Sequence, residues 1–252
     1  MLISAFGGAG FYAVGAFWVL ECTVLFGPDA HDIARQLTTF GFAFLLGIFF
    51  VGWAIDLSRG RIREVFLIAS CVATAGVAAM NAISADTPML SIGLSFLAGL
   101  GLGGIYVPIE IVLTILSPDQ LIGGITGLGL AFRWIGGGIG YAIYFNVFQN
   151  KLTDVVPMIV GTAVVEAGLP ITKVQAFIEA LLGKDSAGLA AAGATPPILQ
   201  AAQSALVESY TEAIQLVYLV SIAFTGAAVI TSLFLKDIRE HMNERVIAEI
   251  KY

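Results

Sequence analysis

Charged residues are scarce in this 252-residue chain. Lysine and arginine number 12, aspartate and glutamate 18, so only 12% of the residues are charged, against about 25% in a soluble domain. Hydrophobic residues make up 58% and the mean hydropathy is +0.91. This composition excludes an ordinary soluble domain, and no nucleic-acid partner is expected. The sequence instead predicts an integral membrane protein that crosses the bilayer several times.

Cysteine and histidine are also rare. Cys22 and Cys71 both lie in apolar runs, which indicates that there is no disulfide framework. His31 and His241 stand apart from carboxylate or thiol clusters, so we expect no metal site and no cofactor. The motifs HExxH, GxSxG and GxxxxGK[ST] are missing, which leaves no sign of a protease, lipase or ATPase. We therefore expect that the protein is not an enzyme.

Long charge-free runs mark the predicted spans. A helix needs about 20 residues to cross ~30 Å of hydrocarbon. Five charge-free runs reach this length, and a sixth apolar run contains Arg133 as its single charge. The sequence therefore predicts an all-α membrane protein with six transmembrane helices. Their expected ranges are 2–26, 36–56, 64–83, 88–116, 121–149 and 212–235.

Residues 150–211 form the one long hydrophilic segment of the sequence. Apolar residues recur at helical spacing over about 171–183, which predicts an amphipathic helix. The low-complexity linker SAGLAAAGATPP follows, and its two prolines are expected to open a further helix that runs to Tyr210. The expected organisation is spans one to five in 1–149, an extracytoplasmic loop in 150–211, the sixth span in 212–235 and a cytoplasmic tail, predicted to be a short helix, in 236–252.

Basic residues predict the orientation of the spans. Residues 56–64 and 236–252 carry several arginines and lysines, whereas the short loops on the opposite side carry only Arg35. An excess of basic residues in short loops marks the cytoplasmic side, and long loops weigh little. Both termini are therefore expected in the cytoplasm, with residues 150–211 outside.

Arg133 is the only charge between residues 120 and 150. An arginine at the centre of a membrane helix costs ~2.5–3.5 kcal/mol on insertion scales, so we expect it to face protein or a water-filled cavity. Glu21 and Glu110 are candidates for a proton pathway or an ion pair, or else they reach the interface. At ~1.5 Å per residue, Arg133 should lie about 18 Å from the inner membrane end, Glu21 about 28 Å and Glu110 about 9 Å. A direct ion pair therefore requires helix tilt or side-chain reach.

Glycine clusters in the predicted fourth and fifth spans. Gly136 and Gly140, with Gly137 between them, have the small-xxx-small spacing that lets another helix approach closely. In the fourth span Gly99 and Gly103 precede a proline, a combination that permits bending, as in gated transporter helices. Tight packing alone is an alternative interpretation of both sets.

Aromatic residues offer candidate ligand contacts. Tyr106 and Trp134 could present flat faces to an amphipathic substrate, although tyrosine and tryptophan also serve as interface anchors. Trp18, Tyr141 and Tyr144 lie nearer to the ends of the predicted spans, so we interpret them as anchors.

One loop resembles the GxxxDRxGRR loop of the major facilitator superfamily. The stretch from Gly52 to Arg61 reads GWAIDLSRGR, and Asp56, Arg59 and Gly60 are its other matching positions. It has one extra residue before the glycine and a leucine where a basic residue is expected. The stretch that begins RWIGGGIGYAI at Arg133 resembles the penultimate helix of the fourteen-span drug:proton antiporter branch. The end of the chain is similar to fungal transporters of the trichothecene efflux pump type.

The resemblance implies a C-terminal half-bundle of a major facilitator transporter. It implies that the first and fourth spans line a central cavity, the second and fifth flank it, and the third and sixth lie outside. It also places the first and fifth spans side by side, which favours Glu21 over Glu110 as the neighbour of Arg133. The match covers only the second half of such a transporter, so the chain is expected to be a fragment or a truncated gene product.

The implied function is proton-coupled export of small amphipathic organic molecules across the plasma membrane, or across the vacuolar membrane. Ferric-siderophore uptake on the same scaffold is one alternative, and a half that does not transport is another. The expected partners are the lipid bilayer, a small-molecule substrate, protons, and either a missing N-terminal half or a second copy of the chain.

Overall fold

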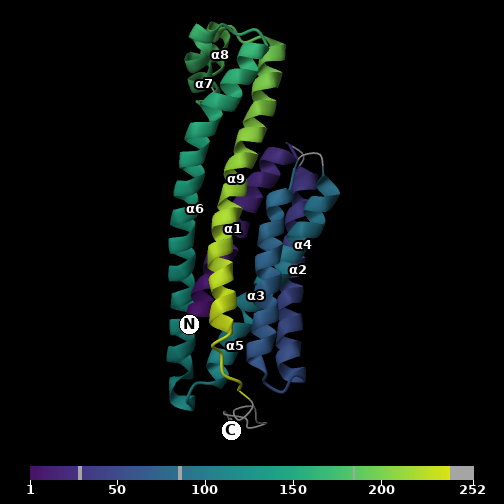
Figure 1. The fold of residues 1–252 in the computed structure, drawn as a ribbon, viewed down its shortest axis with the longest axis vertical. Coiled ribbons are helices and arrows are strands. Elements are labelled where there is room, and N and C mark those ends of the chain that lie inside the picture. The colour runs from purple at the N-terminus through teal and green to yellow at the C-terminus, as the bar shows by residue number, and fades with distance from the viewer. Residues whose placement is uncertain (28–29, 85–86, 184, 239–252) are drawn as a thin grey trace, which may run out of the picture. The chain divides into compact units, whose positions relative to one another are not determined.

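The computed structural model describes residues 1–27, 30–84, 87–183 and 185–238, and every regular element in these ranges is a helix (Figure 1). The all-α prediction is confirmed. The tail helix predicted within 236–252 and the predictions about His241 lie, beyond Ile238, outside the described residues. The α-helices are α1 (Leu2–Leu25), α2 (Ala30–Leu57), α3 (Ile62–Ala79), α4 (Pro88–Tyr106), α5 (Pro108–Ile115), α6 (Ile122–Glu166), α7 (Val174–Leu182), α8 (Ser186–Ala192) and α9 (Pro196–Ser232).

Five segments of the described chain are long and apolar enough to cross a membrane. They are Leu2–Leu25, Ala30–Leu57, Ile62–Ala82, Pro88–Ile115 and Pro196–Ser232. Helix α6 contains the predicted fifth span, but its many glycines and Arg133 keep it below this level of hydropathy. Its crossing of the membrane therefore stays a prediction from the sequence.

The chain folds into two compact units. The first unit comprises Met1–Tyr144 and Tyr218–Tyr252, and the second comprises Phe145–Val217. Helices α6 and α9 contribute residues to both.

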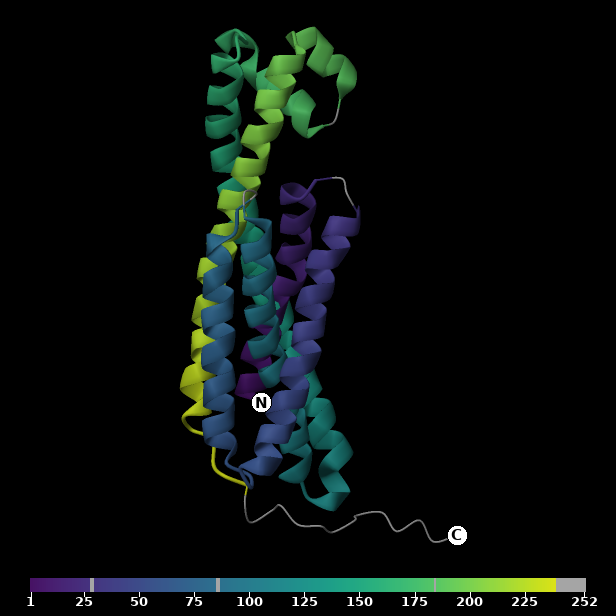
Figure 2. The ribbon, with the colours of Figure 1, turned by 90° about the vertical axis from the view of Figure 1, so that its right-hand side faces the viewer.

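Within the first unit, α4 packs against α2 and α3, and Figures 1 and 2 both show these three helices side by side. Glycines make the close approach to α2 possible. A Cβ added to Gly99 would lie 2.6 Å from the carbonyl oxygen of Phe40, and one added to Gly103 would collide with the backbone of Phe44. The helix backbones meet here because α4 carries no side chain at these positions.

Glycines also bring α1 and α6 together. A Cβ on Gly136 would collide with the carbonyl oxygen of Ala5, one on Gly140 would lie 2.8 Å from the Cβ of Ala9, and one on Gly137 would press on a tyrosine ring of α1. The expected neighbourhood of the first and fifth predicted spans is therefore confirmed.

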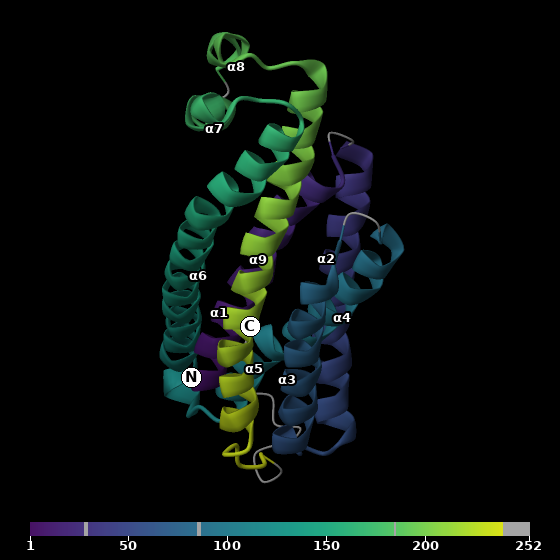
Figure 3. The ribbon, with the colours of Figure 1, turned by 45° about the horizontal axis from the view of Figure 1, so that its top comes forward.

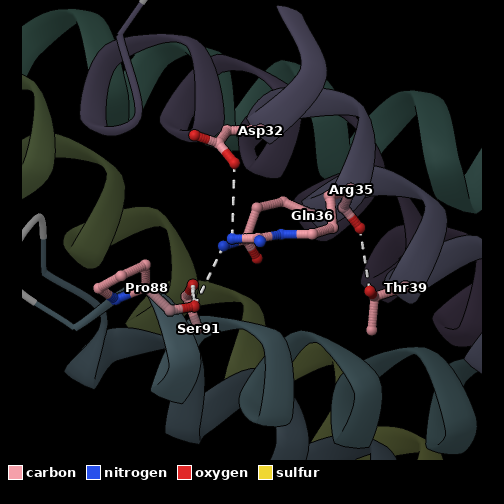
Figure 4. A network of polar contacts seen from close by, with 6 residues as sticks. All are labelled: Asp32, Arg35, Gln36, Thr39, Pro88 and Ser91. Atoms are coloured by element: carbon pink, nitrogen blue, oxygen red, sulfur yellow. Dashed lines mark hydrogen bonds and ion pairs between the residues drawn. The ribbon is translucent and has the colours of Figure 1, made fainter. Parts of the chain in front are cut away.

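Polar contacts join the beginnings of α2 and α4 (Figure 4). The buried Gln36 donates from Nε2 to the carbonyl oxygen of Pro88 at 3.1 Å, and Ser91 Oγ donates to the same oxygen at 2.7 Å. One residue earlier on α2, Arg35 pairs with Asp32 at 3.5 Å. The side chain of Gln36 thus fixes the start of one helix to the start of the other.

The loop that resembles the superfamily motif forms a tight turn between α2 and α3. Arg59 and Gly60 have φ angles of 54° and 81°, a left-handed conformation that glycine adopts without steric cost. The N–H of Gly60 donates to the carbonyl oxygen of Ile55 at 3.0 Å, which satisfies a carbonyl at the end of α2. The carbonyl oxygen of Gly60 accepts from the N–H of Ile238 at 3.1 Å. Two segments predicted to be cytoplasmic therefore meet at one end of the first unit.

The second unit has an apolar core of its own. Val156, Val160 and Val164, one turn apart on α6, pack in one cluster with Phe177 of α7 and Ala202 of α9. Figure 3 shows α7 and α8 next to each other. Lys151 and Glu212, from α6 and α9, form an ion pair at 2.7 Å.

The segment 150–211 is more helical than the sequence analysis predicts. The amphipathic helix over 171–183 is confirmed as α7, but the linker prediction is wrong because it contains α8, whose start is capped by the Asp185 carboxylate. The helix that opens at Pro196 does not end at Tyr210 but runs through the sixth span to Ser232. Likewise α6 continues past residue 149 to Glu166. The charges in 150–166 suggest a loop, but the buried valines supply the apolar face that keeps the helix intact.

Candidate functional site

A buried ion pair lies at the centre of the candidate site. Nη2 of Arg133 on α6 donates to Oε1 of Glu110 on α5 at 2.7 Å, and the two residues are only 6% and 7% exposed. Ser4 Oγ on α1 lies 2.6 Å from the same carboxylate oxygen. Three helices of the first unit therefore meet at one carboxylate.

A break in the fourth predicted span positions Glu110. Helix α4 ends at Tyr106 and α5 begins at Pro108, which has no N–H to continue the helical ladder. Bending at this proline, which the sequence permits, stays a prediction. Glu110 thus lies in the first turn of α5, and its N–H donates to the carbonyl oxygen of Val107 at 3.0 Å.

The pair keeps unused hydrogen-bonding capacity. Gly129 of α6 leaves room for the carboxylate, since a Cβ there would collide with Oε2 of Glu110. Within the described chain Oε2 of Glu110 and Nε of Arg133 are buried without a hydrogen-bond partner. An acceptor and a donor therefore remain available beside the ion pair.

The preference for Glu21 as the neighbour of Arg133 is wrong. Glu21 is fully buried on α1, and its Oε2 accepts a hydrogen bond from the hydroxyl of Tyr218 on α9 at 2.7 Å. Side chains lean toward the N-terminus of their helix, so the arginine points down α6 toward the short connection with α5. Glu110 lies near that connection, whereas Glu21 lies farther along the bundle.

Six aromatic residues form a continuous surface beside the ion pair, which we call the aromatic face. Ring centroids lie 4.8 Å apart for Phe11 and Tyr106, 5.5 Å for Phe44 and Tyr106, and 6.0 Å for Phe11 and Tyr12. Tyr12 then contacts Trp134 at 6.3 Å and a further tyrosine at 6.2 Å. The members are Phe11 and Tyr12 of α1, Phe44 of α2, Tyr106 of α4, and Trp134 and Tyr141 of α6.

The aromatic face is partly open and touches the ion pair directly. Trp134 is 60% exposed, and the other five rings are all partly or largely accessible. The guanidinium carbon of Arg133 lies 4.2 Å from the centroid of the Tyr106 ring, which is a cation–π contact. By contrast, Trp18 and Tyr144 are fully buried, so the interpretation of these two residues as interface anchors is wrong.

Of these six residues the sequence indicates Tyr106 and Trp134 as candidate ligand contacts, and Tyr141 is interpreted from it as an interface anchor. Phe11, Tyr12 and Phe44 are not predicted. In the sequence these three residues cannot be distinguished from lipid-facing or packed aromatics. The available signal is their helical position, since Tyr12 lies one turn from Gly8, the residue at which α1 meets the backbone of Arg133.

The arrangement suits a molecule with both apolar and polar parts. Ligand pockets combine aromatic and apolar walls with a few well-placed polar groups. The aromatic face supplies flat apolar area, and the ion pair supplies a buried donor and acceptor. Across the described ranges, no group of three or more histidine, cysteine, aspartate or glutamate side chains could hold a metal ion.

Comparison with known proteins gives consistent matches. The family model of the fungal trichothecene efflux pump (TRI12) matches residues 2–251. The trichothecene efflux pump TRI12 of Fusarium sporotrichioides is 23% identical over 250 residues, covering 98% of this chain and 42% of that protein. TRI12 of Trichoderma arundinaceum is 25% identical over 229 residues, covering 87% and 37%.

A third relative is the MFS-type transporter prx5 of Penicillium rubens, 31% identical over 157 residues, which covers 61% of this chain and 28% of that protein. The chain thus spans between 28% and 42% of the length of these curated relatives. No solved structure matches the chain. The family match over nearly the whole length, together with the apolar helices, identifies a multi-pass membrane protein. The chain belongs to the fungal trichothecene efflux pump family.

Proposed function

We propose that this chain forms one half of a proton-coupled exporter that moves small amphipathic organic molecules across the plasma membrane. The observation that carries the proposal is the aromatic face beside the buried Arg133–Glu110 pair. Four helices, α1, α2, α4 and α6, contribute to this surface, and these are the helices that the superfamily resemblance places at or beside a central cavity.

The aromatic face holds the apolar body of the substrate. The rings exclude water and stack on flat or cyclic parts of a ligand. A polar substituent reaches the free acceptor Oε2 of Glu110 or the free donor Nε of Arg133. Binding there competes with the ion pair, because a ligand group that forms a hydrogen bond with one partner weakens its interaction with the other.

A second bundle of six helices closes the other side of the substrate path. An exposed apolar row on α6 supports such a partner. Leu128, Phe132, Ile135 and Ile139 are 50%, 36%, 59% and 55% exposed, at intervals of three or four residues. Exposed to water or lipid, this row makes no specific contacts. Against a second bundle it supplies an extended packing surface.

Transport in inverted membrane vesicles tests the proposal. The chain is expressed together with an N-terminal bundle of the same family, and a pH gradient that makes the vesicle interior acidic is imposed. We expect accumulation of a fluorescent amphipathic compound, and a loss of at least about tenfold in Arg133→Ala, as expected when an important polar contact worth about 1.4 kcal/mol or more is lost. Trp53→Leu is the matched control, because Trp53 is 58% exposed but is not part of the aromatic face.

Three outcomes would count against the proposal. Accumulation without a gradient would refute proton coupling. Release of a preloaded ferric siderophore from the vesicles in its place would favour the uptake alternative. Equal transport by this chain with and without the N-terminal bundle would refute the half-transporter.

A further inference from the structure

A second polar contact, separate from the ion pair, joins α1 to α9 in the first unit. The hydroxyl of Tyr218 donates to Oε2 of Glu21 at 2.7 Å, and neither residue is exposed to any extent. The other carboxyl oxygen, Oε1, is buried and has no hydrogen-bond partner in the described chain. Trp18, one turn earlier on α1, has a buried indole N–H that is likewise unpaired.

The surroundings of Glu21 contain no compensating charge. Among the described residues no lysine, arginine or histidine nitrogen lies within 4.0 Å of its carboxyl group, whereas Glu110 has Arg133 at 2.7 Å. The titratable groups that interact with Glu21 are Tyr218 of α9 and Cys22 of α1, neither of which supplies a positive charge.

Burial decides between the two charge states of Glu21. A carboxylate taken out of water without a cation loses far more solvation free energy than a single phenolic hydrogen bond returns. A neutral carboxylic acid in the same place loses only the solvation free energy of one oxygen that has no hydrogen-bond partner. Two carboxyl groups in one bundle therefore differ in kind: Glu110 is paired with an arginine, and Glu21, which has no cation beside it in the described chain, is stable at depth in its neutral form.

We propose that Glu21 is a proton-binding site, protonated while α1 is packed on α9 and deprotonated when the two helices separate. The inference rests on the proposed function in one respect, since it assigns to Glu21 the proton of proton-coupled transport. The site itself depends only on the contact between α1 and α9.

Proton release and helix movement are linked in this site. An ionised Glu21 needs water, and separation of α9 from α1 at the Tyr218 contact would admit it. Reprotonation restores the neutral group, and the hydroxyl of Tyr218 re-forms its hydrogen bond.

Infrared spectroscopy of the reconstituted chain tests the protonation state directly. A protonated carboxylic acid has a C=O stretching band that an ionised carboxylate lacks. In phosphatidylcholine vesicles near neutral pH we expect this band in the wild type and in Glu110→Gln, and its loss in Glu21→Gln. Solvent-exposed aspartate and glutamate are ionised at this pH and do not contribute.

A second variant guards against a folding failure of Glu21→Gln. Tyr218→Phe keeps the carboxyl group but removes its donor, so the band should persist and shift to higher frequency. An unshifted band in Tyr218→Phe, a band that disappears in Glu110→Gln, or no acid band in the wild type would overturn the proposal. None of these outcomes depends on transport, so a failure here is distinct from a failure of the proposed function.

Spin labels test the link to helix movement. Val19 on α1 and Leu219 on α9 are 42% and 49% exposed, so that labels there leave the buried contact intact. Raising the pH until the acid band is lost should lengthen the distance between the labels. The distance in Glu21→Gln should stay constant over the same range. A distance change that persists in this variant would show that another group controls the separation.

Discussion

Arg133 interacts with three different kinds of group. It forms an ion pair with Glu110, stacks on the ring of Tyr106, and places its backbone carbonyl against Gly8 of α1. Removing one partner of a buried pair typically costs about 3–5 kcal/mol, because the other charge is left uncompensated. The pair therefore constrains where α5 and α6 lie relative to each other, and it does so next to the proposed substrate surface.

A double-mutant cycle measures this coupling. Arg133→Ala and Glu110→Gln should each lower the free energy of unfolding, and the double variant should lose about 1–2 kcal/mol less than the sum of the two, since residues in contact do not act independently. Unfolding is measured by titration with a denaturing detergent.

The matched control is the cycle of Arg133→Ala with Glu21→Gln, which should be additive within about 0.5 kcal/mol. Coupling in the control cycle and additivity in the first would contradict the contacts described for Arg133.

At the residue scale the sequence predicts that Arg133 needs a partner, but it does not predict which residue that partner is. That Arg133 must avoid lipid follows from its charge and its apolar neighbours. The choice between Glu21 and Glu110 depends on depth, and a straight-helix estimate of depth ignores both the break at Pro108 and the lean of a long side chain. Tyr218, the real partner of Glu21, lies 197 positions away in the chain, and no local pattern links the two residues.

At the scale of elements, glycine and proline set the geometry of the bundle. Gly99 and Gly103 let α4 approach α2, Gly136 lets α6 approach α1, and Pro108 divides α4 from α5. Each glycine contact is backbone against backbone, so that even a methyl group has no room. Helices joined in this way can move relative to each other only by sliding or separating as whole units.

Two neighbouring glycines of α6 provide a matched test of this packing. A Cβ on Gly136 would collide with α1, whereas one on Gly138 has no atom within 4 Å. Gly136→Ala should therefore lower the free energy of unfolding by about 1–3 kcal/mol through overpacking. Gly138→Ala should be neutral, or stabilise by up to about 1 kcal/mol through helix propensity. Equal effects at both positions would mean that α1 does not pack against this face of α6.

The ends of the helices show why elements are only partly predictable. The start of α9 at Pro196 follows from the preference of proline for the first turn, and α7 follows from its amphipathic spacing. The sequence does not predict that α6 and α9 continue through the hydrophilic segment. A helix with charges on one face has a composition similar to that of a loop. Only the partner surface reveals which residues are buried, as the valines at 156, 160 and 164 show.

At the scale of the whole molecule, the two units have different chemistry. The first unit contains the aromatic face and both buried carboxyl groups, and the second has a small apolar core under charged and polar helix surfaces. The arginine-rich loop after α2 and the backbone hydrogen bond from Ile238 to Gly60 place two basic segments at one end of the first unit. Positive charge on that side supports a cytoplasmic location and predicts that the second unit is extracytoplasmic.

Thiol labelling checks this orientation. Ser204 is an exposed residue of the second unit, and Ser204→Cys is introduced after Cys22 and Cys71 are replaced by alanine and serine. An impermeant maleimide should react with intact cells, and permeabilisation should add little. A thiol at Ser58, in the turn predicted to be cytoplasmic, is the control and should react only after permeabilisation. The reverse pattern at the two sites would invert the topology.

Amphipathic molecules are proposed to bind on the aromatic face. Two tryptophans allow a direct measurement of that binding. Trp134 on this face and Trp53 away from it are 60% and 58% exposed, while the buried Trp18 is common to both proteins compared. A brominated amphipathic compound is titrated into Trp53→Phe, which reports on Trp134, and into Trp134→Phe, which reports on Trp53. We expect saturable quenching in Trp53→Phe that Tyr106→Leu weakens, and only linear quenching by partition in Trp134→Phe. Linear quenching of equal slope in both proteins would show that the compound does not bind on the aromatic face.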